Sequence, residues 1–204
     1  MKRAILMSFA VLAAATAVSV LTPAVALAHT GHADTSGSVH GFTHPITGID
    51  HILAMVAVGV LAAQLGGRAL WMVPLTFVCV MAVGGALGMA GIQVPFAELG
   101  IALSVVVLGL AIAFPLKVPA LAAMALVGFF AVFHGHAHGA EMPAAASALP
   151  YAAGFIGATA LLHAVGLGLG LLFGLEGRRL GHRVVQAAGG AMAVFGVAVL
   201  AGVF

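Results

Sequence analysis

The chain has 204 residues, of which 63% are hydrophobic and only 6% charged, with a formal net charge of +2. Soluble domains carry about 25% charged residues, so this composition excludes a soluble globular protein, and the lack of a basic patch excludes a nucleic-acid-binding one. The single cysteine, Cys79, excludes a disulfide framework and any Cys-x-x-Cys motif. An integral membrane protein remains, and its 10 histidines are unusual in so apolar a chain.

The first 28 residues have the pattern of a secretory signal peptide. Two basic residues, Lys2 and Arg3, precede an apolar run, and the small-residue sequence Ala26-Leu27-Ala28 follows it. We therefore expect cleavage after residue 28, with an uncleaved first transmembrane helix as the alternative. Residues 29–43 would then form a short, flexible periplasmic tail that contains histidines.

Residues 44–204 predict a domain of six transmembrane helices. A spanning helix needs about 20 apolar residues. Windows of this kind fall at 44–65, 69–90, 96–114, 118–137, 150–173 and 184–203. The expected fold class is an all-α membrane protein. Some glycines recur every four residues, a small-xxx-small spacing that lets helices approach closely. They are Gly84 and Gly88 in one span, and Gly166, Gly170 and Gly174 in and after another.

The basic residues orient the predicted bundle. The loops after the first, third and fifth spans hold Arg68, Lys117, Arg178, Arg179 and Arg183, whereas the other loops and the C-terminus have no Lys or Arg. The positive-inside rule places the basic loops in the cytoplasm. We therefore expect a multi-pass protein of a bacterial inner membrane, with the mature N-terminus and the C-terminus in the periplasm.

The first predicted span opens with His44-Pro45-Ile46-Thr47-Gly48-Ile49-Asp50-His51. Proline suits the first turn of a helix, so we expect the helix to begin near His44. His44 and His51 would then point within about 20° of each other. A carboxylate in a span costs at least a few kcal/mol unless it is paired or hydrated. Asp50 is therefore a candidate ligand, imidazole partner or proton acceptor; the alternative is a backbone cap near the interface.

A second cluster ends the fourth span, with the sequence Phe133-His134-Gly135-His136-Ala137-His138-Gly139-Ala140-Glu141. A continued helix places His134, His138 and Glu141 on one face, and that spacing suits two imidazoles and a carboxylate on one divalent ion. The glycines between the histidines could instead open the helix and free His136 as a further ligand.

His163 lies in the middle of the fifth span, about 20 Å from its outer end at 1.5 Å per residue. It is either a structural hydrogen-bond donor to a neighbouring helix or a deeper station on an ion path. With both motifs in the outer half of the membrane and His163 below them, the pattern favours uptake over export.

Both motifs resemble those of the HupE/UreJ family of bacterial nickel membrane proteins. The family patterns, H-x5-D-H in the first span and F-H-G-x-A-H-G-x-E near the fourth, are matched without a mismatch. The signal peptide and six spans extend the resemblance over essentially the whole chain. The resemblance implies a role in nickel supply to hydrogenase or urease, and it marks as functional His44, Asp50, His51, His134, His138 and Glu141, with His136 at a variable position.

The function implied is a secondary transporter that takes up Ni²⁺, or Co²⁺, from periplasm to cytoplasm. Imidazole and carboxylate ligands suit Zn²⁺, Co²⁺ and Cu²⁺ equally, so nickel rests on the resemblance alone. The sequence has no Walker motif, so we expect no use of ATP. One alternative is a metal-binding accessory or sensor protein without transport. Another is a bis-histidine haem protein. An intramembrane metalloenzyme would need an HExxH-like base, which is absent, so we expect no enzyme.

We expect no prosthetic group, with the divalent ion as cargo. The candidate metal-contacting residues are His44, Asp50, His51, His134, His136, His138, Glu141 and His163. The expected partners are the ion and membrane lipid, without nucleic acid. Homo-oligomerisation and contact with nickel-enzyme maturation proteins are left open by the sequence.

Overall fold

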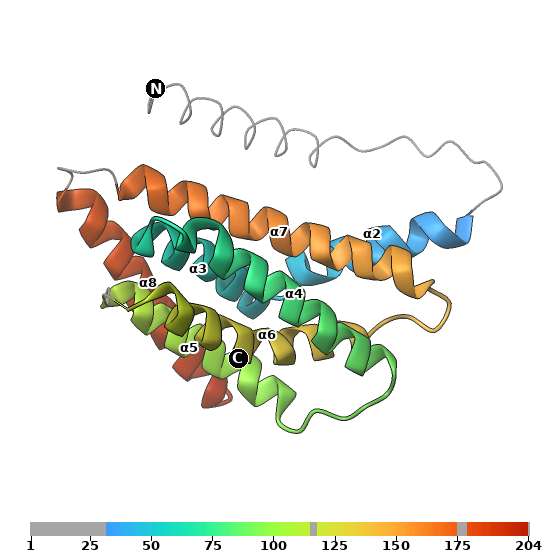
Figure 1. Cartoon of the computed structure of the whole chain (residues 1–204). Coiled ribbons are helices and arrows are strands. Elements are labelled where there is room, and N and C mark those ends of the chain that lie inside the picture. Colours follow the sequence, from blue (N-terminus) through green and yellow to red (C-terminus); the bar gives the residue numbers. More distant parts are fainter. Residues whose placement is uncertain (1–31, 115–117, 175–178, 204) are drawn as a thin grey trace. The chain divides into compact units, whose positions relative to one another are not determined.

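The structure, a computed structural model, describes residues 32–114, 118–174 and 179–203 (Figure 1). In these ranges every regular element is an α-helix, so the predicted all-α class is confirmed. The helices are α2 (His32–Thr47), α3 (Ile49–Leu65), α4 (Ala69–Met89), α5 (Ala97–Ala113), α6 (Ala120–Ala140), α7 (Ala148–Phe173) and α8 (Arg179–Leu200). The predicted signal peptide, residues 1–28, lies outside the described residues, as do Lys117 and Arg178.

Helices α3 to α8 coincide with the six predicted spans to within a few residues at each end. Four of them, α4, α6, α7 and α8, are long and apolar enough to cross a membrane. A fifth span is obtained if α2 and α3 are counted as one bent element. Helix α5 is apolar but shorter, with 17 residues. The described chain therefore has the character of a multi-pass helical membrane protein.

The prediction that the first helix begins near His44 is wrong. Helix α2 ends at Thr47 and α3 begins at Ile49, and the two are bent by 84° relative to each other. Gly48 between them has an extended backbone, with φ −89° and ψ 118°, which interrupts the helical hydrogen bonding. His44 and His51 consequently lie on different helices, so their spacing of seven residues does not place them on one face.

The expectation of a flexible tail before the first span is also wrong over most of its length, because residues 32–47 form α2. This helix runs beside α7 (Figure 1). Glycines permit the close approach: a methyl group at Gly41 would overlap the backbone of Tyr151, and one at Gly154 would overlap the backbone of Ser38. Helix α2 is therefore held against the bundle by backbone contact, and its end is fixed next to α3.

The most extensive helix pairings are α4 with α6, α5 with α8 and α3 with α7. The packing of α4 against α6 depends on glycine. A methyl group at Gly135 would overlap the carbonyl oxygen of Met81, and a methyl group at Gly88 would overlap the carbonyl oxygen of His136. Added methyl groups at Gly84, Gly166 and Gly170 would also collide with a neighbouring helix. The predicted close packing is confirmed at Gly84, Gly88, Gly166 and Gly170 but not at Gly174, where a methyl group would meet only its own helix. The contacts of α6 with α4 fix the histidine-bearing end of α6 within the bundle.

Candidate metal centre

Polar side chains are scarce in the core of the described bundle, and most of them are histidines. The buried ones are Ser104, His134, His138, Thr159 and His163, none more than 3% exposed. A buried polar group without a hydrogen-bond partner costs about 1–3 kcal/mol, so such groups need a structural or functional reason. Eight buried side-chain nitrogen or oxygen atoms in the described chain have no partner, and seven of them are histidine nitrogens.

Asp50 and His51 form a pair at the first turn of α3. One carboxylate oxygen of Asp50 accepts a hydrogen bond from the His51 backbone N–H, at 2.8 Å, and contacts Nδ1 of the same ring, at 2.9 Å. An ionised carboxylate only accepts, so Nδ1 carries the proton and the lone pair is on Nε2. That Nε2 is buried without a partner. Asp50 thus prepares His51 to donate its Nε2 lone pair, the arrangement common in carboxylate–histidine–metal sites.

The Asp50–His51 pair depends on the glycine before it. A Cβ atom at Gly48 would lie 2.8 Å from Oδ1 of Asp50 and 3.1 Å from Nδ1 of His51. The break between α2 and α3 therefore leaves space for the paired side chains as well as turning the chain.

Helix α6 continues to Ala140, so His134 and His138 share one helical face as predicted, whereas Glu141, predicted on the same face, follows the end of the helix. Both histidines are fully buried. Nε2 of His134 is hydrogen-bonded to Oγ of Ser104 on α5, at 2.9 Å, and Nδ1 has no partner. The His138 ring stacks on Phe155, with centroids 5.5 Å apart, and neither of its nitrogens has a partner.

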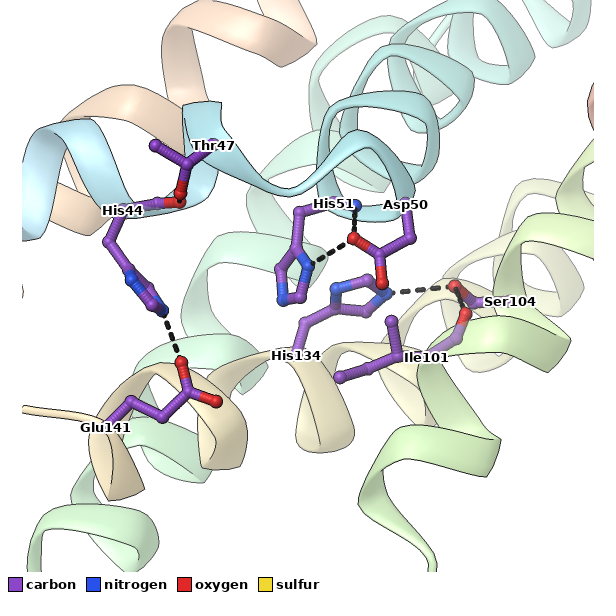
Figure 2. A network of polar contacts seen from close by, with 8 residues as sticks. All are labelled: His44, Thr47, Asp50, His51, Ile101, Ser104, His134 and Glu141. Atoms are coloured by element: carbon purple, nitrogen blue, oxygen red, sulfur yellow. Dashed lines mark hydrogen bonds and ion pairs between the residues drawn. The ribbon is translucent and has the colours of Figure 1, made fainter. Parts of the chain in front are cut away.

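The imidazoles of α3 and α6 converge. The ring centroid of His51 is 4.8 Å from that of His134 and 4.7 Å from that of His138, while His44 lies 5.1 Å from His138. Figure 2 shows His51 and His134 facing each other across the junction of the two helices. We call His51, His134 and His138 the histidine cluster. In the described residues no three His, Cys, Asp or Glu side chains are already arranged around a common metal position, because the rings pack against one another.

His44 and Glu141 form an ion pair beside this cluster. Nε2 of His44, in the last turn of α2, is 2.7 Å from Oε2 of Glu141, which follows the end of α6. The two side chains are 33% and 54% exposed, whereas in the cluster His134 and His138 are buried and His51 is 14% exposed. The pair is thus the more exposed part of the site. Figure 2 shows it beside the contacts of Asp50, His51 and His134.

His163 on α7 shares an aromatic neighbour, Phe77, with the cluster. Phe77 of α4 is fully buried, with its ring centroid 5.7 Å from His134 and 5.2 Å from His163. Neither nitrogen of His163 has a partner, and the described contacts do not give it the hydrogen bond that a purely structural role would require. The structure therefore places His163 near the cluster, in contact with a ring that also contacts His134.

His136 is engaged elsewhere. Its Nε2 lies 3.0 Å from the carbonyl oxygen of Ile92 and 3.3 Å from the backbone nitrogen of Val94, both in the connection between α4 and α5. The described ring contacts join His136 to none of the other imidazoles. Of the eight candidate residues, the structure brings together Asp50, His51, His134 and His138, with His44 and Glu141 adjoining and His163 linked to them through contact with Phe77.

Sequence reasoning missed two residues of the site, Phe77 and Ser104. Phe77 is one of 12 phenylalanines, and nothing in its neighbours distinguishes it. Ser104 did have a signal, because it is the one serine within the six predicted spans. A lone hydroxyl in an apolar span indicates a polar partner on its own or a neighbouring helix.

Comparison with known proteins gives two matches. The family model described as "HupE / UreJ protein" matches residues 16–199. The chain is also similar to "Protein HupE" of Rhizobium leguminosarum bv. viciae, with 50% identity over 189 residues, which is 92% of this chain and 96% of that protein. No solved structure matches the chain.

Proposed function

This chain belongs to the HupE/UreJ family, and from that membership and the histidine cluster we propose that it is a secondary transporter for Ni²⁺. The cargo moves from periplasm to cytoplasm and supplies the maturation of hydrogenase or urease. Co²⁺ is a second cargo, because it binds the same kinds of ligand as Ni²⁺. The nickel assignment follows the family resemblance, since imidazoles alone also suit zinc.

The observation that carries this proposal is the set of unpartnered imidazole nitrogens on facing helices. Nε2 of His51, Nδ1 of His134 and both nitrogens of His138 are buried without hydrogen bonds. Neutral imidazole is a good ligand for first-row divalent ions, and coordination would satisfy these lone pairs. Because the three rings now pack against each other, binding rotates them around the ion.

The surrounding residues suggest a route. The partly exposed His44–Glu141 pair receives the ion from the periplasm, the histidine cluster holds it, and His163 takes it past the Phe77 ring, which contacts both His134 and His163. In the predicted orientation, with Arg68 and Arg183 on the cytoplasmic side, this order runs inward. His136 holds the α4–α5 connection and has a minor part in ligation.

The test is uptake of radiolabelled nickel by cells that express the wild type, His51→Ala or His138→Ala at equal protein levels. His182→Ala is the matched control, because it removes an exposed imidazole of α8 outside the cluster. We expect uptake by the wild type and the control and at least a tenfold loss in both cluster variants. Added Co²⁺ and Zn²⁺ measure selectivity.

The alternatives have distinct outcomes in this design. Nickel binding by the purified protein without uptake above the empty vector would replace the transporter by an accessory or sensor protein. A Soret band in the purified protein would favour bis-histidine haem ligation instead.

A further inference from the structure

Ser104 is fully buried in α5 and makes two short contacts. Its Oγ lies 2.6 Å from the carbonyl oxygen of Ile101, in the preceding turn, and 2.9 Å from Nε2 of His134 on α6 (Figure 2). A serine that bonds only to its own helix is common and has no functional meaning. The second contact, to a buried imidazole of another helix, is what distinguishes Ser104.

The direction of these hydrogen bonds follows from counting protons. A serine hydroxyl has one proton to donate, and a carbonyl oxygen can only accept. The contact with Ile101 therefore uses the Ser104 proton, because two oxygens 2.6 Å apart without a proton between them would repel. The contact with His134 then requires the ring to donate, so Nε2 carries the proton.

This direction determines which nitrogen of His134 is available. A neutral imidazole with its proton on Nε2 has its lone pair on Nδ1. Nδ1 of His134 is buried without a partner, and in Figure 2 it is on the side of the ring turned toward His51. The ring centroids of the two histidines are 4.8 Å apart.

We propose that Ser104 is a positioning residue that fixes the tautomer and orientation of His134, so that this histidine coordinates the ion through Nδ1. The proposal rests on the proposed metal function of the cluster. It makes the site asymmetric, because Asp50 holds the proton on Nδ1 of His51 and leaves Nε2 as the ligand atom there. The Ser104 hydroxyl thus leaves Nδ1 of His134 for the ion, and the Asp50 carboxylate leaves Nε2 of His51 for the same ion.

The first measurement is ¹⁵N nuclear magnetic resonance of the purified full-length protein with labelled histidine, without metal. The His134 resonances are assigned by their loss in His134→Gln. We expect a proton on Nε2 of His134 in the wild type, and in Ser104→Ala a shift of this resonance as its hydrogen bond is lost. A wild-type His134 protonated on Nδ1 would overturn the proposal.

The second measurement is the affinity of the same proteins for Ni²⁺ alone. Loss of a partner that orients a metal-bound histidine typically weakens binding about 10- to 100-fold, and we expect this range for Ser104→Ala. Thr76→Val is the matched control, because its hydroxyl bonds to the carbonyl oxygen of Met72 in its own helix. We expect the affinity of Thr76→Val for Ni²⁺ to equal that of the wild type.

Both readouts must change together in Ser104→Ala. Weaker binding with an unchanged His134 resonance would assign Ser104 a merely structural role, and a changed resonance with unchanged affinity would show that the tautomer does not matter; either result overturns the proposal. Failure of the proposed function is separate, since it appears as wild-type protein that neither binds nor takes up nickel.

Discussion

The Phe77 ring meets the His163 ring edge-on, with centroids 5.2 Å apart and planes at 89°. Phe77 also contacts His134, with ring centroids 5.7 Å apart, so one aromatic side chain touches both the histidine cluster and His163. All three side chains are buried. Phe77 therefore packs against an imidazole of the histidine cluster and against the imidazole of α7.

Phe77→Ala should destabilise the protein more than Phe129→Ala. Replacing a buried Phe by Ala costs about 3–5 kcal/mol in soluble proteins, largely through the cavity that it leaves. Phe129 of α6 is 60% exposed, so its replacement leaves little cavity. The midpoint of thermal unfolding in one detergent, compared between the two variants, measures the difference. Equal midpoints would show that the packing around Phe77 is loose.

Gly135→Ala should both destabilise the protein and weaken nickel binding. Its methyl group would overlap the backbone of Met81, and overpacking typically costs 1–3 kcal/mol. Because α6 must move away from α4, the neighbouring His134 is displaced. Gly168→Ala on α7 is the control, since an added methyl group there meets nothing within 4 Å. Alanine in a helix is favoured over glycine by up to about 1 kcal/mol, so the control should unfold at the same or a higher temperature.

Asp50→Asn should weaken Ni²⁺ binding about 10- to 100-fold while the protein stays folded. The amide keeps the shape of the side chain but lacks the charge that holds the proton on Nδ1 of His51. Titration calorimetry on the purified variant gives the affinity, and circular dichroism checks the helix content. Wild-type affinity in Asp50→Asn would refute the role of Asp50 as the partner of His51.

Glu141→Gln should slow uptake with little effect on stability. The pair with His44 is partly exposed, and exposed ion pairs contribute about 0–1 kcal/mol. Glu141 is not part of the histidine cluster. The equilibrium affinity for Ni²⁺ should therefore fall less in Glu141→Gln than in Asp50→Asn. The concentration of nickel at half-maximal uptake should rise, because capture at the accessible side weakens. A large drop in the unfolding temperature would instead assign the pair a structural role.

The sequence by itself determined the helical class, the approximate ends of α3 to α8 and the two histidine motifs. These features depend on local composition and spacing, since apolar runs of spanning length form helices and residues four apart share a face. His134 and His138 were paired correctly for this reason. The same reasoning was wrong for His44 and His51, because a single extended residue, Gly48, ends one helix and lets the next leave at 84°.

Only the tertiary structure decided which side chains meet. Ser104 is 30 residues from His134, and Phe77 lies on a different helix from each of the two imidazoles that it contacts. Such contacts depend on how closely helices approach and where they cross, which glycines at the α4–α6 interface set through backbone contact. Helical periodicity gives the face on which a residue lies, but the neighbour opposite that face is fixed by packing between helices.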